Sequence, residues 1–165
     1  MKRIWLFIFS LLIFLLSSNT SFAKSNYELP YPGLLPDSPL YFLRVIRDRT
    51  VELLIADPLK KAEYNLLQAD KRLNAGIYLF NKGKASLSLS TISKAENYFD
   101  KAIEKIKEAK KQGMDVDDMQ RRLTNAVIKH QEELTKLIKI ADKNLKGNFE
   151  KEFKRIMGFE QRLKH

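Results

Sequence analysis

The sequence predicts an all-α protein, an antiparallel helical bundle of four to five helices preceded by a Pro-rich strap. Three observations lead to this fold class. Apolar residues recur every three or four positions over long stretches, which is the period of an amphipathic helix. Prolines and glycines stand where such helices would begin and end. The one stretch that alternates like a strand, 85–91, has no second strand to pair with, so we interpret it as the first turns of a helix.

The first 23 residues have the order of a secretory signal peptide. Lys2 and Arg3 precede the apolar run 4–16, and small side chains at Ser21 and Ala23 stand before the expected cleavage site. A helix of that run spans roughly 20 Å, less than a hydrocarbon core of about 30 Å. We therefore favour cleavage after Ala23, and a secreted or extracytoplasmic location in the cell envelope, over an uncleaved membrane anchor.

Composition limits the kinds of site and partner. There is no cysteine, which excludes disulfides, thiolate metal sites and cysteine nucleophiles. The net charge is +10, and removing Lys2 and Arg3 leaves 28 basic and 20 acidic residues, or +8. Such a surplus is compatible with an anionic wall polymer or membrane surface as partner, although we favour the simpler interpretation of a solvated lysine-rich surface. Export disfavours nucleic acid as a partner.

Residues 24–38 are expected to form the strap that leads into a single helical domain at 39–165. Four of the five prolines fall within 27–39, and proline fixes φ and removes a backbone donor. The segment is extended but not polar. Its apolar residues favour a strap packed on the domain over a flexible tether: Leu29, Tyr31, Leu34 and Leu35.

Capping residues predict the first two helices. The order Asp37-Ser38-Pro39 indicates a capping side chain and a proline in the first turn of a helix at about 39–55. Asp57-Pro58 repeats this device and opens a second helix that extends to about residue 82, where Gly83 is an end signal.

Three further helices follow. The third is expected at 85–111 and ends before Gly113, and Asp115 is a candidate cap for a fourth helix that reaches about residue 146. Gly147-Asn148 is expected to interrupt it and to leave a short fifth helix at 149–163. The connection at 81–84 is short, which predicts an antiparallel hairpin of the second and third helices.

Apolar stripes on these helices define the expected core. They alternate large side chains with Ala or Gly, which lets neighbouring helices approach closely. Their members are Leu59, Ala62, Leu66, Ala69, Leu73, Gly76 and Phe80, then Ile92, Ala95, Phe99, Ala102, Ile106 and Ala109, then Val116, Met119, Leu123, Val127, His130, Leu134, Leu137 and Ala141.

The opening Pro-Gly-Leu-Leu-Pro-Asp-Ser-Pro-Leu-Tyr-Phe-Leu, residues 32–43, fits a motif PGxLPDSPLYFL. With Arg47-Asp48-Arg49, Asp57-Pro58, Arg72-Leu73 and Lys129-His130 it resembles an uncharacterised family of exported bacterial helical proteins, a domain of unknown function. The resemblance covers about 31–145 and implies a helical bundle outside the cytoplasm, with no activity or site residues. Members often carry a Glu soon after the Arg-Leu pair, where this chain has Asn74-Ala75-Gly76.

No catalytic motif or cofactor-binding pattern occurs, so we expect neither an enzyme nor a bound cofactor or metal. His130 lies on the apolar stripe of the fourth helix, and we interpret it as a packing residue with one ring nitrogen satisfied. The alternatives are a pH-sensitive switch and a ligand for a small anion. Asp115, Asp117 and Asp118 are explained by the positive end of a helix dipole, a weak calcium site being the alternative.

The last 23 residues combine charge with an apolar stripe. They hold seven basic and three acidic residues, together with Phe149, Phe153, Ile156 and Leu163. We expect this stripe to complete the bundle. The alternative is an amphipathic helix on an anionic surface, with contacts from Lys151, Lys154, Arg155 and Lys164.

The sequence thus predicts a non-enzymatic, exported interaction or structural module of the bacterial cell envelope or exterior. Its partner is an unidentified protein or an anionic envelope polymer or membrane surface, and the oligomeric state is open. The alternative function is binding of an anionic surface by the basic C-terminal helix. A third hypothesis, an extracytoplasmic sensor of ions or stress, rests on His130 and the acidic cluster at Asp115.

Overall fold

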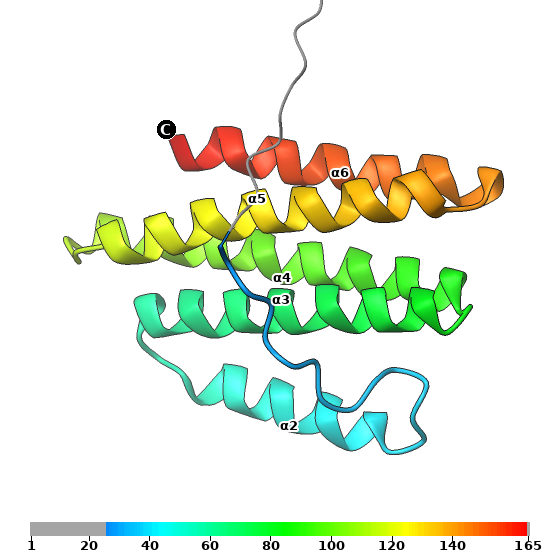
Figure 1. Cartoon of the computed structure of the whole chain (residues 1–165). Coiled ribbons are helices and arrows are strands. Elements are labelled where there is room, and N and C mark those ends of the chain that lie inside the picture. The colour runs from blue at the N-terminus through cyan, green and yellow to red at the C-terminus, as the bar shows by residue number, and fades with distance from the viewer. Residues whose placement is uncertain (1–25, 165) are drawn as a thin grey trace, which may run out of the picture.

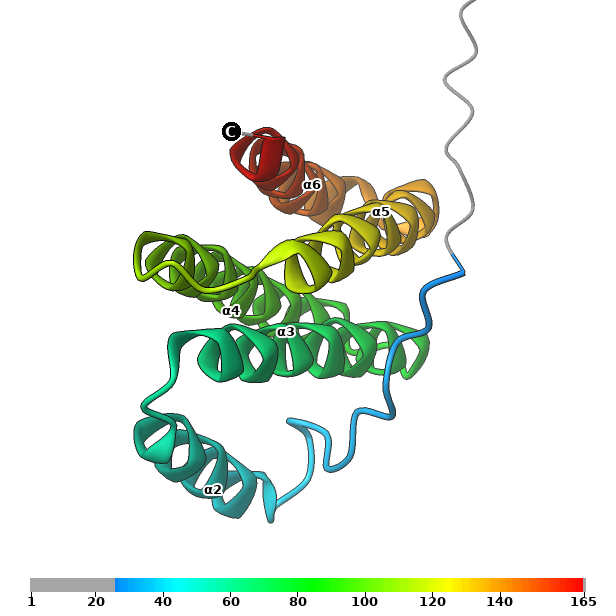
Figure 2. The same cartoon turned by 90° about the vertical axis from the view of Figure 1, so that its left-hand side faces the viewer.

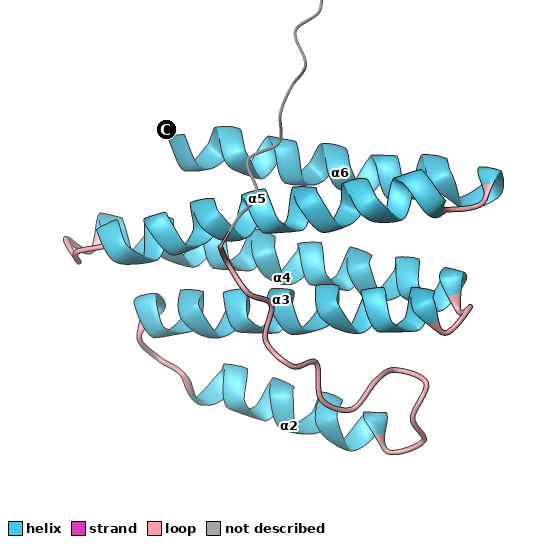
Figure 3. Cartoon of the chain, in the orientation of Figure 1, coloured by secondary structure: helices cyan, strands magenta, loops and turns pink. Residues whose placement is uncertain are grey.

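The computed structural model describes residues 26–164, with the side chain of Lys164 excepted, and every regular element among them is an α-helix (Figures 1 and 3). This confirms the predicted fold class. The helices are α2 (Tyr41–Leu54), α3 (Pro58–Asn81), α4 (Ala85–Lys111), α5 (Asp117–Ile140) and α6 (Lys143–Lys164).

Four of these helices, α3 to α6, run alternately in opposite directions and form an up-and-down bundle (Figure 1). The most extensive packing is between α3 and α4, which form the expected antiparallel hairpin, and α5 and α6 make a second hairpin beside it (Figure 2). Helix α2 lies outside the bundle against α3 and touches it over a small area.

The core of the bundle consists of the predicted stripes. All six stripe residues of α4 are buried, as are most of those on α3 and α5, while Leu59, Phe80 and Ala141 pack against the core at its edges. Phe99 of α4 joins three helices, because its ring stacks on Phe159 of α6 at 5.5 Å and meets the ring of His130 edge-on at 5.0 Å between centroids.

The glycines predicted to end helices agree with the structure better than the residues predicted to cap their N-termini. Gly83 and Gly113 follow α3 and α4 with φ of 74° and 76°, the left-handed conformation that glycine tolerates best. Asp57 caps α3 by accepting a hydrogen bond from the backbone N–H of Lys60 at 2.8 Å. The capping side chain predicted within Asp37-Ser38-Pro39 is not observed. Helix α2 begins only at Tyr41, without a side-chain cap.

Asp37 instead fastens the strap to the turn between α3 and α4. Its Oδ2 lies 3.0 Å from the ammonium of Lys82 and 2.8 Å from that of Lys84. Two cations from a distant turn thus share one carboxylate of the strap.

The boundary between the last two helices also differs from the prediction. Helix α5 ends at Ile140, and α6 starts at Lys143 and continues through Gly147-Asn148 as regular helix. Ala141 is extended with ψ of 143°, and the carbonyl of Asp142 accepts the first helical bonds of α6 from Leu145 and Lys146. Because the turn is confined to residues 141–142, α5 and α6 pack against each other along nearly their whole length. The helix tolerates Gly147, whose neighbourhood is open.

The Pro-rich strap crosses the bundle, as expected, but only part of it packs. Tyr27 and Leu29 contact the core, and the carbonyl of Pro30 accepts a 2.9 Å hydrogen bond from the side chain of Asn74. Tyr31 and Leu34 were expected to be packed and are exposed, at 77% and 44%. Hydrogen bonds from the Arg44 side chain to the carbonyls of Pro32 and Leu34, and the ion pairs of Asp37, hold the second half of the strap instead.

Within the described residues, no helix is long and apolar enough to cross a bilayer. The expected signal peptide, residues 1–23, lies outside the described part of the chain, so its cleavage stays a prediction.

Gly76 of α3 packs directly against Ile92 and Ser88 of α4. A Cβ placed on it would overlap Cγ1 of Ile92 and lie 3.3 Å from the backbone oxygen of Ser88. Both neighbours are fully buried, so neither can move without disturbing the core. The small residue predicted at this point of the stripe is therefore required by the spacing of the hairpin.

We expect Gly76→Ala to lower the free energy of unfolding by about 1–3 kcal/mol through overpacking, despite the better helix propensity of alanine. Gly147→Ala in α6 is the matched control. It places the same methyl group in open space on a helix and should raise the free energy of unfolding by about 0.5–1 kcal/mol. Urea denaturation of both variants measures the difference, and stabilisation of both would show that the hairpin is loosely packed.

Candidate functional site

Three charged side chains from three helices meet in the middle of the bundle. Nδ1 of His130 on α5 lies 3.1 Å from Oε1 of Glu96 on α4, and Nε2 lies 3.1 Å from Oδ1 of Asp70 on α3. His130 and Glu96 are fully buried and Asp70 is 3% exposed. Each of the two ring nitrogens of His130 therefore faces a different carboxylate.

The geometry favours a charged histidine. Carboxylates only accept hydrogen bonds, so an imidazole between two of them is best satisfied when both nitrogens carry a proton. Burial alone lowers the pKa of His130, but the carboxylates of Glu96 and Asp70 outweigh it and raise that pKa to about 9. Burial also raises the pKa of Glu96, against the attraction of His130. Oε2 of Glu96 is buried without a hydrogen-bond partner.

The strap closes this cluster from the outside. The hydroxyl of Tyr27 donates a 2.5 Å hydrogen bond to Oδ2 of Asp70, so Asp70 uses one oxygen for His130 and the other for the strap. Burial and the Asp70 carboxylate both raise the pKa of Tyr27, which keeps the phenol protonated and able to donate. The arrangement Tyr27–Asp70–His130–Glu96 ties the strap and three helices together.

The interpretation of His130 as a packing residue with one nitrogen satisfied is corrected by this arrangement. Sequence spacing placed His130 on the buried stripe, which is confirmed, but the two carboxylates lie on other helices. Asp70 and Glu96 each directly follow a stripe alanine, Ala69 and Ala95. The available signal was an acidic residue at the edge of a buried stripe. Its pairing with His130 can be recognised only once the helices are packed together.

The cluster does not have the geometry of a metal centre. Asp70 and Glu96 approach the imidazole from opposite nitrogens, so the three groups do not converge on one point, and no metal-holding group of His, Asp and Glu occurs among residues 26–164. The acidic residues before and within the first turn of α5 are exposed to solvent, with Asp118 paired to Arg121 at 3.0 Å.

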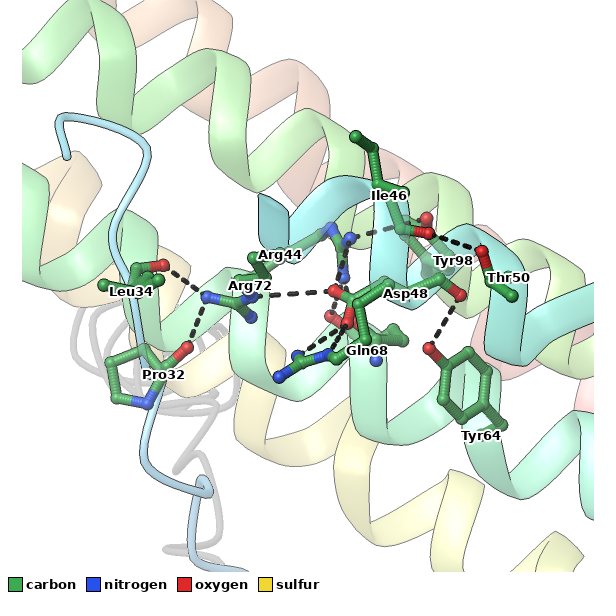
Figure 4. A network of polar contacts seen from close by, with 11 residues as sticks. Pro32, Leu34, Arg44, Ile46, Asp48, Thr50, Tyr64, Gln68, Arg72 and Tyr98 are labelled. Atoms are coloured by element: carbon green, nitrogen blue, oxygen red, sulfur yellow. Dashed lines mark hydrogen bonds and ion pairs between the residues drawn. The ribbon is translucent and has the colours of Figure 1, made fainter. Parts of the chain in front are cut away.

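A second polar cluster joins α2 to the bundle (Figure 4). Oδ2 of Asp48 lies 3.5 Å from Nε of Arg44 on the same helix and 3.5 Å from an amino nitrogen of Arg72 on α3. Arg47 adds a 2.7 Å contact to Oδ1. We call Arg44, Asp48 and Arg72 the latch, because all three are buried and they form the main contact of α2 with α3.

Neighbouring groups complete the latch. The guanidinium of Arg72 lies 4.0 Å from the ring centre of Tyr98 on α4 and also bonds the side chain of Gln68. The hydroxyl of Tyr64 donates to the backbone oxygen of Asp48 at 2.9 Å. Arg44 continues the network to the strap by donating to the carbonyl oxygens of Pro32 and Leu34 (Figure 4).

Residues of the latch were missed at the sequence level. Arg44 and Asp48 are spaced i, i+4 and read as an exposed ion pair on an amphipathic helix. On α3, Gln68 and Arg72 share the interval of a stripe with Asn65, Ala75 and Leu79, and all five are buried. This second stripe on α3, with polar residues at its N-terminal end, was the signal that α3 has a further buried face.

The predicted surface residues of the C-terminal helix are only partly free. Lys151 and Lys154 are exposed, while Arg155 pairs with Glu152 at 2.9 Å and donates to Asn97. The side chain of Lys164 lies outside the described part of the chain. The apolar stripe of this helix packs into the bundle, which confirms the favoured interpretation: Phe149, Phe153, Ile156 and Leu163 are buried or packed on the core.

Comparison with known proteins gives one match. A family model described as "Domain of unknown function (DUF5667)" matches residues 33–144. The match includes the latch and the Asp70–His130–Glu96 cluster and leaves out Tyr27 and nearly all of α6. No curated protein and no solved structure matches the chain.

We expect His130→Leu to lower the free energy of unfolding by about 3–5 kcal/mol, because it leaves two buried carboxylates without their cation. Lys139→Leu is the control, since it introduces the same side chain at an exposed position of α5 and should change stability by no more than about 0.5 kcal/mol. Equal stability of the two variants in urea denaturation would restore the packing interpretation of His130.

The pH dependence of stability should also report on His130. Its folded-state pKa of about 9 exceeds the ordinary value of 6.5, so its contribution is complete below pH 6.5 and is lost as pH rises through 9. The free energy of unfolding should fall by roughly 3 kcal/mol across this window. Glu96 acts in the same direction, because burial raises its pKa as well. His130→Gln should remove most of the fall between pH 6.5 and 9, and an unchanged fall in that variant would assign it to other groups.

Proposed function

Because the chain belongs to the DUF5667 family, whose role is unknown, we propose its function from its geometry: a non-enzymatic interaction module that docks through α2. The observation that carries this proposal is the orientation of that helix. Its two buried residues are Arg44 and Asp48, and its large apolar side chains face away from the bundle. Five of them are between 52% and 83% exposed: Phe42, Leu43, Ile46, Leu53 and Leu54.

An outward apolar face is costly unless it binds something. Isolated exposed apolar residues are ordinary, but a contiguous group on one helix is typical of an interaction site. The latch supports this interpretation, since it holds α2 through charged groups and leaves its apolar residues free for a partner.

A non-enzymatic role is supported by the chemistry of the polar clusters. The imidazole of His130 uses both nitrogens for buried carboxylates, and the charged groups of the latch are buried against each other. No reactive group of either cluster faces solvent in an arrangement of nucleophile and base. The signal peptide that we expect at 1–23 from the order of its basic, apolar and small residues supports a location in the cell envelope or outside it.

The alternative is an anionic-surface binder that uses the basic C-terminal helix. The exposure of Lys151 and Lys154 supports it. The burial of Phe149, Ile156 and Leu163 counts against it, because apolar insertion by α6 would require its removal from the bundle.

Site-specific crosslinking in the native cells tests the proposal. A photo-crosslinking amino acid in place of Leu53, on the outward face of α2, should give a defined adduct with lipid or protein. The same group in place of exposed Glu150 on α6 is the control and should give little. Phe42→Asp, on the same face as Leu53, should abolish the adduct. Adducts of equal yield from both positions, or none from Leu53, would refute docking through α2.

A further inference from the structure

The outward side of α2 has the layout of a helix that lies on a membrane surface. At about 100° per residue, the five exposed apolar side chains of α2 fall within a sector of roughly 120°. Arg49 lies at one edge of this sector, beside Phe42, and Arg47 lies at the other, beside Leu54. Arg49 is exposed, and the Arg47 side chain is 66% exposed. Long cationic side chains at both edges of an apolar sector can reach phosphate groups while the apolar residues insert between lipids.

A cavity beside this sector adds a second observation. It has a volume of about 320 Å³ and lies between the strap and α2. Tyr31, Leu34 and Leu43 form apolar walls, and Arg47 and Lys71 contribute cationic groups. No acidic residue lines it, and its remaining lining residues are Pro32, Gly33 and Arg44. An apolar wall with cations at hand fits an anionic headgroup attached to an acyl chain.

We propose that the face formed by α2, Tyr31 and Leu34 binds the surface of a bilayer that contains anionic lipid. This inference rests on the proposed docking through α2 and names the partner. The acidic residues of α2 do not oppose it, because Asp48 is buried in the latch and Glu52 is paired with Lys101 at 2.9 Å. The surplus of basic residues in the chain adds long-range attraction to the same surface.

A second copy of the chain fits this face less well. A fourteen-residue helix presents a strip of roughly 21 Å by 10 Å, a small part of the about 800 Å² that each partner of a stable complex buries. Self-association through α2 would also bring the same arginines, Arg47 and Arg49, toward their own copies. A bilayer requires no matching surface and supplies negative charge.

Vesicle co-sedimentation tests the proposal with residues 24–165, which contain every described contact and leave out the apolar run 4–16, itself able to bind lipid. Wild type should sediment with vesicles of equal parts phosphatidylcholine and phosphatidylglycerol and much less with phosphatidylcholine alone. Binding should weaken with added salt, because screening acts on the cationic part of the contact.

Three double variants separate the contributions. Arg47→Gln/Arg49→Gln should weaken binding about tenfold or more, and Phe42→Asp/Leu53→Asp should abolish it at any salt concentration. Lys151→Gln/Lys154→Gln removes the same charge from exposed sites on α6 and should bind like wild type. Thermal melts show whether each variant is folded. We expect all three to fold, because the substituted side chains are exposed. Loss of Arg47 still leaves Asp48 paired with Arg44 and Arg72.

Several results would overturn the inference. One is failure of folded wild type to bind the anionic vesicles, and another is equal binding to both vesicle types. Equal loss in the α2 and α6 charge variants would show that binding depends on the total charge of the chain and not on the face of α2. A dimer in solution that Leu53→Asp converts to monomer would assign the face to a second copy. A protein adduct at Leu53 in cells, without vesicle binding, would refute the membrane and leave the docking module standing.

Discussion

The imidazole of His130 is held between a carboxylate of α3 and a carboxylate of α4, and the packing of the bundle depends on this arrangement. The two contacts of 3.1 Å allow one relative placement of three helices. A slip of α5 by one turn, about 5.4 Å, would break both contacts and leave charges buried without partners. Apolar stripes alone tolerate such slips, since alternating large and small residues recur at every turn. The ionic cluster therefore specifies the register of helices that the hydrophobic effect brings together.

The strap extends the same principle to a segment without secondary structure of its own. The hydroxyl of Tyr27 donates to the second oxygen of Asp70. The side chains of Arg44 and Asn74 donate to carbonyls of the strap, which have no partner within a helix or sheet because the prolines keep the strap irregular. The bonds to Asp70 and from Asn74 involve groups that α3 already fixes, so little further ordering is needed to hold that part of the strap. This explains how the strap can cross the bundle while Tyr31 and Leu34 face solvent.

Helix α2 reverses the usual arrangement of an amphipathic helix. Its charged residues point inward because Arg72 of α3 and the strap carbonyls supply partners for Asp48 and Arg44, so the desolvation of these charges is offset by charge-assisted hydrogen bonds. Its apolar residues are left outside as a consequence. An interaction surface is thus created by the polar contacts of the opposite face, and the α6 helix, with its stripe buried, completes the core instead.

The sequence by itself determined the helices and their buried stripes, because the period of apolar residues, Asp57-Pro58 and the glycines at 83 and 113 act within a few residues of each other. Membership of a family of unknown function was also predicted, and the match of its family model to residues 33–144 confirms it. Tertiary structure alone decided three points. Asp37 pairs with Lys82 and Lys84, which lie in a turn some 45 residues away in the sequence. His130 is an ion-paired residue because its partners lie 34 and 60 positions away in the sequence. Helix α2 turns its apolar side outward because Arg72, 24 residues after Asp48, lies where only the folded hairpin can place it. In each case the deciding force is an electrostatic contact between distant residues, which local periodicity does not encode.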